Sequence, residues 1–211
     1  MTNPWLHIPL EDYEGHMALP QVGQAQLLAD VLAGAVEQYR PRSVAVLGCA
    51  GGNGFERLVA AGCRRVVGVD VNATYVQRAR ERFGGRIPQL ELLAGDIQSM
   101  PLDFDPVELV YAGLLLEYVD VEVVMGRVGA MLVGGGRLVA VVQLPCAAMP
   151  EVTPSPYTSL AGLAPVMHLV EPQRLRAAAV AHGLGETGAR VVTAAGGKQF
   201  SVQEFQCATC A

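Results

Sequence analysis

The sequence contains 211 residues, of which 51% are hydrophobic and 17% are charged, and its formal net charge is −5. The acidic balance and the lack of a basic run disfavour a nucleic-acid partner, and no stretch of about 18 uninterrupted apolar residues predicts a membrane span. Five scattered cysteines favour a reduced, cytoplasmic compartment, and the acidic residues near the start do not fit a signal peptide.

The chain is expected to begin with an arm of irregular periodicity over residues 1–19. Pro20 fits the first position of a helix, whose apolar residues recur at three- and four-residue spacing until Pro41 stops it. Residues 43–47 form a continuous apolar run, which is typical of a parallel strand buried on both faces. A short helix over residues 54–61 is expected to follow.

Strands and helices are expected to alternate through the middle of the chain. Asn72 and Asp120 are natural N-caps for two helices, and Gly134 to Gly136 are expected to close the second one. Four more apolar segments predict strands, at residues 65–70, 90–94, 107–112 and 137–143. This alternation argues for a parallel, doubly wound sheet.

The last third of the chain breaks this rhythm. Residues 144–170 contain five prolines and are predicted to form a lid or a substrate-binding segment, because long irregular loops in compact domains are usually functional. A helix is expected from Pro172, and two strands over residues 189–206 meet at a two-glycine turn, which predicts an antiparallel hairpin. We therefore predict one α/β domain over residues 1–211, doubly wound, with a mostly parallel seven-stranded sheet.

The stretch at residues 44–56 carries the strongest functional signal. It runs from an apolar strand into four glycines and then into a helix start, and glycines let the backbone approach a ligand closely. Asp70 closes the second strand and could accept hydrogen bonds from both hydroxyls of a ribose. Asp96 follows the third strand, so three strand ends can line one crevice.

The order of these elements resembles the class I S-adenosylmethionine-dependent methyltransferases. The resemblance extends from about residue 20 to the end and rests on four stretches, at residues 44–54, 68–70, 94–97 and 110–112. It implies a Rossmann-like methyltransferase fold whose sheet ends in an antiparallel hairpin, and it implies S-adenosylmethionine as the cofactor.

The resemblance also implies which residues bind the cofactor. They are Gly48, Cys49, Ala50, Gly52, Asp70, Val71, Asp96, Ile97 and Ala112. In the family, the glycine turn contacts the methionine portion, the acid after the second strand binds the ribose, and the pair Asp96-Ile97 would recognise the adenine. Either acid could instead cap a local turn, and a packed thiol is the ordinary explanation of Cys49.

One position departs from the family pattern at the glycine turn. Val46 stands where the family has an acid that helps to hold the ammonium group of the cofactor, and a valine side chain cannot accept a hydrogen bond. Either another group takes this role or the affinity for the cofactor is reduced. Ala50 stands in place of the middle glycine and is still small.

Methyl transfer is an in-line displacement at a carbon activated by a sulfonium, so the enzyme mainly positions the acceptor. The acceptor is expected to be a small molecule. Tyr13 and His16 in the arm, and Tyr157 and His168 in residues 144–170, are candidates for contact with it. His16 is the candidate catalytic base because its ordinary pKa is near 6.5, although a surface or merely hydrogen-bonded histidine is the alternative.

Other functions stay open. A NAD-dependent oxidoreductase shares the strand, the turn and the acid, but the spacing Gly-x-Gly-x-x-Gly fails at Ala50 and Asn53. A non-catalytic binding or interaction module is kept open by Val46. Aminopropyl transfer is disfavoured because residues 144–170 lack the acidic cluster that a polyamine would need. No metal site is expected, since the pair Cys207 and Cys210 lacks partners, and a homodimer is compatible with the sequence.

Overall fold

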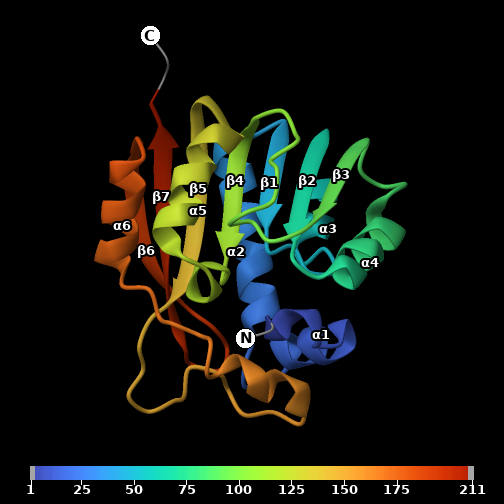
Figure 1. Cartoon of the computed structure of the whole chain (residues 1–211), viewed down its shortest axis with the longest axis vertical. Coiled ribbons are helices and arrows are strands. Elements are labelled where there is room, and N and C mark those ends of the chain that lie inside the picture. The colour runs from blue at the N-terminus through green and yellow to red at the C-terminus, as the bar shows by residue number, and fades with distance from the viewer. Residues whose placement is uncertain (1–2, 209–211) are drawn as a thin grey trace.

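The computed structural model describes residues 3–208. They form a seven-stranded sheet in the order β3-β2-β1-β4-β5-β7-β6, with helices on both faces (Figure 1). This confirms the predicted doubly wound α/β fold. Neighbouring strands pair in parallel except at β7, which runs antiparallel to both β5 and β6. The strands are β1 Ser43–Leu47, β2 Arg65–Asp70, β3 Gln89–Ala94, β4 Val107–Gly113, β5 Leu132–Gln143, β6 Leu184–Thr193 and β7 Gln199–Cys207.

The helices divide between the two faces of the sheet. The α-helices are α1 Leu10–Ala18, α2 Gln24–Tyr39, α3 Phe55–Ala60, α4 Ala73–Phe83, α5 Val121–Met131 and α6 Pro172–Ala181. Short 3-10 helices are η1 Pro4–Leu6, η2 Leu116–Tyr118 and η3 Thr158–Leu163. One core lies between the sheet and α2, α3 and α4, and the other lies between the sheet and α5 and α6.

Strand β1 is apolar at successive positions because both of its faces are buried. Val44 and Val46 belong to the core beneath α2, α3 and α4, whereas Ala45 and Leu47 belong to the core beneath α5 and α6. Successive side chains of a strand point to opposite faces, so a central strand covered on both sides needs apolar residues at every position. All four side chains are at most 3% exposed.

Helix boundaries confirm some local predictions and correct others. The side chains of Asn72 and Asp120 cap α4 and α5, as predicted. The prediction for Pro20 is wrong, because Gly23 adopts a left-handed conformation (φ 61°) and α2 begins only after it. The prediction for Gly134 to Gly136 is also wrong, because these glycines lie inside β5, where the pairing with β4 shifts register. Glycine suits such a bulge.

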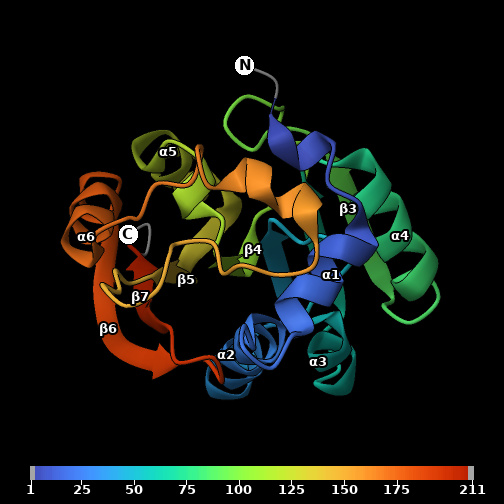
Figure 2. The same cartoon turned by 90° about the horizontal axis from the view of Figure 1, so that it is seen from below.

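The arm is more regular than its sequence predicts. Asn3 caps η1, and α1 follows with Leu10 and Met17 buried on one side of the helix. We keep the name arm for residues 1–19 and call residues 144–170 the cover segment. Seen from below in Figure 2, η1 and α1 of the arm lie beside η3 of the cover segment, across the carboxyl ends of the parallel strands.

Replacing Gly196 by alanine is expected to destabilise the protein by about 1–3 kcal/mol, the usual cost of overpacking. A Cβ atom at this position would lie 1.9 Å from the carbonyl oxygen of Gln21, and backbone cannot rotate away as a side chain can. Denaturant unfolding measures the loss. Gly85→Ala is the matched control, since its Cβ would meet no atom within 4 Å; equal losses in the two variants would contradict the explanation.

Candidate functional site

The carboxyl ends of β1 to β4 surround one hollow, which we call the crevice. Its wall includes Gly48, Asp70 and Asp96, which come from the first three strand ends. The strand order reverses between β1 and β4, and ligands of open α/β sheets bind at such a reversal. The three separate signals in the sequence therefore meet in one place.

The turn after β1 is tied to the end of β2. The N–H groups of Gly48 and Cys49 both donate to the carbonyl oxygen of Val69, at 2.8 and 3.1 Å. Cys49 is 1% exposed and belongs to the core, and burial raises the pKa of its thiol well above the ordinary value. The turn thus presents Gly48 to the crevice, while the side chain of Cys49 faces away from it.

Two non-glycine residues of the crevice wall have a left-handed backbone. They are Ala50 (φ 46°) and Leu114 (φ 55°), and this conformation costs roughly 1–2 kcal/mol without glycine. Such strain gathers at functional sites. The methyl group of Ala50 packs with Leu10 and Tyr75, which offsets part of the cost and accounts for an alanine at the middle position of the turn.

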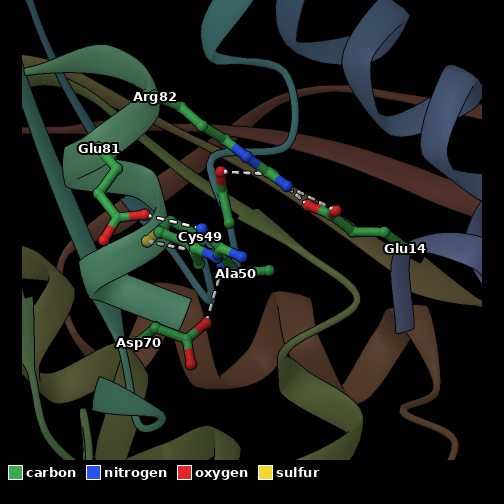
Figure 3. Close-up of polar contacts among 8 residues, drawn as sticks. Glu14, Cys49, Ala50, Asp70, Glu81 and Arg82 are labelled. Atoms are coloured by element: carbon green, nitrogen blue, oxygen red, sulfur yellow. Dashed lines mark hydrogen bonds and ion pairs between the residues drawn. The ribbon is translucent and has the colours of Figure 1, made fainter. Parts of the chain in front are cut away.

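Backbone donors hold the carboxylate of Asp70 in place. Its Oδ2 accepts the N–H of Ala50 at 2.8 Å, a contact drawn in Figure 3, and its Oδ1 accepts the N–H of Asn72 at 2.9 Å. Burial raises the pKa of Asp70, and the backbone hydrogen bonds act in the opposite direction. Each oxygen retains a second lone pair, so a diol in the crevice can bond to it without breaking the turn.

The far wall of the crevice is formed after β2 and β3. Val71, Asp96 and Ile97 all line it. One carboxylate oxygen of Asp96 accepts the backbone N–H of Gln98 at 2.9 Å, which fixes the side chain, and Ile97 is 5% exposed. A carboxylate beside an apolar side chain can accept a hydrogen bond from an amino group while the ring that carries it packs alongside.

Three predicted cofactor positions do not line the crevice, namely Cys49, described above, Gly52 and Ala112. Ala112 is fully buried in β4, and Gly113 and Leu114 stand at the wall instead, because β4 continues to Gly113. Gly52 borders a separate hollow on the other side of the turn. Its φ of 93° and the ring of Phe83, 2.5 Å from where a Cβ would lie, both require glycine at this position.

Aromatic side chains from four elements, η1, α1, α4 and η2, cover the crevice. Trp5 packs edge-on against Tyr13 and Tyr118, with ring centroids 5.5 and 5.0 Å apart, and Tyr13 stacks on Tyr75 at 6.1 Å. We call these four residues the aromatic roof. The sequence interpretation assigns a site role to Tyr13 but misses Trp5 and Tyr75. The position of Tyr75 in the first turn of α4, three residues after the cap Asn72, is the one local signal for it.

The arm is fastened to the glycine turn and to α4. Arg82 donates to both carboxylate oxygens of Glu14 and to the carbonyl oxygen of Gly51, the latter at 3.1 Å. Figure 3 shows this contact on the side of the turn opposite to Asp70. The hydroxyl of Tyr75 donates to the carbonyl oxygen of Ile8 at 2.9 Å. Burial and the nearby carboxylates of Asp70 and Glu14 raise the pKa of Tyr13.

A second hollow, which we call the side hollow, adjoins the crevice beneath the cover segment. The two hollows share Trp5, Tyr13, Leu114 and Tyr118. His16 lines the side hollow and is 5% exposed, and its Nδ1 lies 2.9 Å from Oγ of Ser155. Burial first, and the charge of Lys198 second, lower the pKa of His16.

Tyr157 and His168, the other predicted substrate contacts, line neither of these hollows. The ring of Tyr157 packs against Gly15 of α1. His168 is exposed, and its backbone N–H donates to the carbonyl oxygen of Glu117 at 2.8 Å. Both residues therefore attach the cover segment to the rest of the molecule.

Residues 3–208 contain neither a cluster of metal-ligating side chains nor a helix that could cross a membrane. No three His, Cys, Asp or Glu side chains in this range gather as they would around a metal ion. Cys207 ends β7, and its predicted companion Cys210 lies outside the described residues. No helix in the same range is long and apolar enough to cross a membrane.

Residues 44–136 match a protein family described as methyltransferase domain, and no curated protein matches the chain. Many solved structures are similar to it, and three of them are described here. An S-adenosylmethionine-dependent methyltransferase from Mesorhizobium loti is 20% identical, with a TM-score of 0.63 over 78% of this chain and 90% of that one. Magnesium protoporphyrin IX methyltransferase from Synechocystis PCC 6803, with bound SAH, is 14% identical, with a TM-score of 0.65 over 89% and 84%. The [4+2]-cyclase SpnF is 14% identical, with a TM-score of 0.65 over 86% and 82%.

Proposed function

Because the chain has the Rossmann-like fold of the S-adenosylmethionine-dependent methyltransferases and a methyltransferase domain over residues 44–136, we propose that it binds S-adenosylmethionine and transfers the methyl group to a small molecule. The cofactor occupies the crevice in this proposal. The magnesium protoporphyrin IX methyltransferase with bound SAH, the demethylated product of this cofactor, supports the choice of ligand.

The observation that carries the proposal is the convergence of Gly48, Asp70 and Asp96 on the crevice. A nucleoside fits this arrangement well. The carboxylate of Asp70 accepts the two ribose hydroxyls, and Asp96 accepts from the exocyclic amine of an adenine that packs on Ile97. The methionine portion then follows the turn at Gly48 toward the end of β4.

The arm and the cover segment complete the site over the core, so that residues 1–211 work as one domain. Trp5 and Tyr13 of the arm close the crevice, while the cover segment encloses the side hollow. Exclusion of water by such closure strengthens electrostatic interactions inside a site. The methyl group would meet its acceptor where the two hollows share their walls.

The chemistry needs little from the protein besides alignment. The acceptor atom attacks the methyl carbon, the carbon–sulfur bond breaks, and its electron pair returns to sulfur, which leaves as a neutral thioether. His16 is the candidate base if the acceptor must lose a proton, because burial favours the neutral imidazole that can take one. Tyr13 is the second acceptor-side candidate, since it lines both hollows.

Binding without methyl transfer is the second candidate function. Val46 occupies the position at which the family has an acid, and it is 3% exposed and packs in the core. Its side chain therefore offers no hydrogen-bond acceptor to the ammonium group of the cofactor. SpnF, a protein of similar fold, is a [4+2]-cyclase by name, which is a reaction other than methyl transfer. A NAD-dependent activity has no comparable support in the crevice.

Thermal unfolding with S-adenosylhomocysteine and with NAD tests the ligand. At a hundred times its dissociation constant, a ligand adds about 2.7 kcal/mol, which raises the Tm of a chain of this size by roughly 5–10 °C. We expect this rise with S-adenosylhomocysteine and none with NAD. A rise with NAD alone would overturn the proposal. Binding of S-adenosylhomocysteine with no transfer to any acceptor would favour the second candidate.

A further inference from the structure

The side hollow has a mainly apolar wall. Besides the residues that it shares with the crevice, its apolar lining consists of Met17, Val152, Leu160, Leu163 and Met167. Three rings of the aromatic roof, those of Trp5, Tyr13 and Tyr118, also face it. Aromatic pairs prefer offset or edge-to-face contacts, so these rings can interact in either way with an aromatic ligand in the hollow. This wall suits a flat ring compound.

The polar groups of the side hollow are nearly all uncharged. They are the amides of Gln24 and Gln143, the hydroxyl of Thr153 and the ring of His16, for which burial favours the neutral form. No lysine or arginine belongs to the lining that residues 3–208 provide. The wall thus offers hydrogen bonds without a cation to balance an anion.

Lys198 and Glu151 carry opposite charges near the side hollow. The charge of Lys198 acts on His16, and the carboxylate of Glu151 partly balances it, since burial lowers the pKa of Lys198 and Glu151 opposes that shift. The ammonium group of Lys198 donates to the backbone carbonyl oxygen of Glu151, which also accepts from the side-chain amide of Gln143 at 3.1 Å. Glu151 is an exposed residue of the lining, so its carboxylate stands at the rim. An anionic ligand would lose its hydration and approach this carboxylate, which is unfavourable.

His16 can receive a proton from a ligand in the side hollow. In the tautomer whose Nδ1–H donates to Oγ of Ser155, 2.9 Å away, the lone pair of Nε2 is free to accept a hydrogen bond. A hydroxyl group supplies that hydrogen, whereas an ether does not. In this tautomer the hollow distinguishes a hydroxyl from an ether, and the contact with Ser155 is compatible with it.

We infer that the methyl acceptor is an uncharged ring compound bearing a hydroxyl group, bound in the side hollow with its hydroxyl toward His16. This inference rests on the proposed function and narrows its substrate class. In the transfer, the oxygen forms a bond to the methyl carbon, the carbon–sulfur bond breaks toward sulfur, and the hydroxyl proton passes to Nε2 of His16 and then to water.

Calorimetric titration of the protein saturated with S-adenosylhomocysteine tests the inference, with three matched probes. They are 2-naphthol, its carboxylate analogue 6-hydroxy-2-naphthoate and its ether 2-methoxynaphthalene. We expect 2-naphthol to bind at least tenfold more tightly than the carboxylate and severalfold more tightly than the ether. Tighter binding of the carboxylate, equal binding of all three, or no binding of 2-naphthol at millimolar concentration would each overturn the inference.

Two histidine variants test the place of the hydroxyl. His16→Leu should reduce the affinity for 2-naphthol to that for the ether while leaving the affinity for S-adenosylhomocysteine unchanged, and His168→Leu, at an exposed position outside the side hollow, should change neither. An unchanged preference for 2-naphthol in His16→Leu would refute the role of His16. S-adenosylhomocysteine is titrated first. If it does not bind, the proposed function is contradicted; if it binds and 2-naphthol does not, only the inferred class of acceptor is contradicted.

Discussion

Asp70→Asn is expected to weaken the binding of S-adenosylhomocysteine by about a hundredfold. Hydrogen bonds to a charged carboxylate contribute roughly 1.5–3 kcal/mol each. In Asp70→Asn the hydrogen bonds from both ribose hydroxyls would lose their charged acceptor. An asparagine also has one acceptor oxygen in place of two, so it cannot hold the N–H groups of Ala50 and Asn72, as Asp70 does, and bind both hydroxyls as well. Calorimetric titration measures the change.

The control for this prediction separates binding from folding. Asp105 is an exposed acid outside the crevice, so Asp105→Asn changes the net charge equally and should leave the affinity unaltered. Circular dichroism and the melting temperature establish that Asp70→Asn is folded. If a folded Asp70→Asn protein bound S-adenosylhomocysteine as the wild type does, the nucleoside would not lie against this carboxylate.

The second large effect concerns a buried carboxyl in η2, the short helix that follows β4. Burial raises the pKa of Glu117 from 4.5 to about 7. Its Oε1 accepts the backbone N–H of Gln143 at 2.7 Å, whereas its buried Oε2 has no hydrogen-bond partner among residues 3–208. The folded protein therefore favours the protonated acid, and the unfolded chain ionises it more readily.

The direction of the pH dependence follows from these two pKa values. Below the unfolded pKa the carboxyl is neutral in both states, and as the pH rises toward 7 the unfolded chain releases the proton first, so stability falls. Between pH 5 and pH 8 Glu117 should cost the wild type about 2–3 kcal/mol. Glu117→Gln keeps an oxygen for Gln143 and cannot ionise, so it should lose less stability over this interval.

Urea unfolding at several pH values checks the prediction through the difference between variant and wild type. The difference also removes the contribution of His16, whose pKa is shifted in the opposite sense. Glu37→Gln, at an exposed position, should give a curve parallel to that of the wild type. A parallel curve for Glu117→Gln as well would mean that the carboxyl is not held in its neutral form.

The fold was predictable because its signals are local. The uninterrupted apolar run of β1, the caps Asn72 and Asp120, and the glycine turn of the final hairpin each specify a few neighbouring residues. The crevice was predictable for the same reason, since Gly48, Asp70 and Asp96 each follow a strand and parallel strands bring such ends together. The predicted end of β4 was one residue too early, since the strand runs to Gly113, and Gly113 and Leu114 therefore line the crevice where Ala112 was expected.

The aromatic roof and the side hollow depend instead on distant contacts. Tyr75 donates a hydrogen bond to Ile8, which is 67 positions away in the sequence, and Arg82 donates to Glu14, which is 68 positions away. No periodicity or spacing links such pairs, so the sequence could assign Tyr13 and His16 to an acceptor side without indicating what they would face. Tyr157 and His168 had the same chemical character but line neither hollow, because Tyr157 packs against Gly15 and the side chain of His168 is exposed.

The fastening of the arm bears on the rate of turnover. Trp5 and Tyr13 line the crevice in which we propose that the cofactor binds, so we expect release of the cofactor product to require movement of the arm and opening of the contact between Glu14 and Arg82. Both side chains of this pair are partly exposed to solvent, where dissolved ions screen their attraction. The residence time of the product should therefore shorten as the salt concentration rises. The slowest step of the catalytic cycle would then be the opening of this contact, whose two residues are 68 positions apart in sequence, and not the transfer of the methyl group.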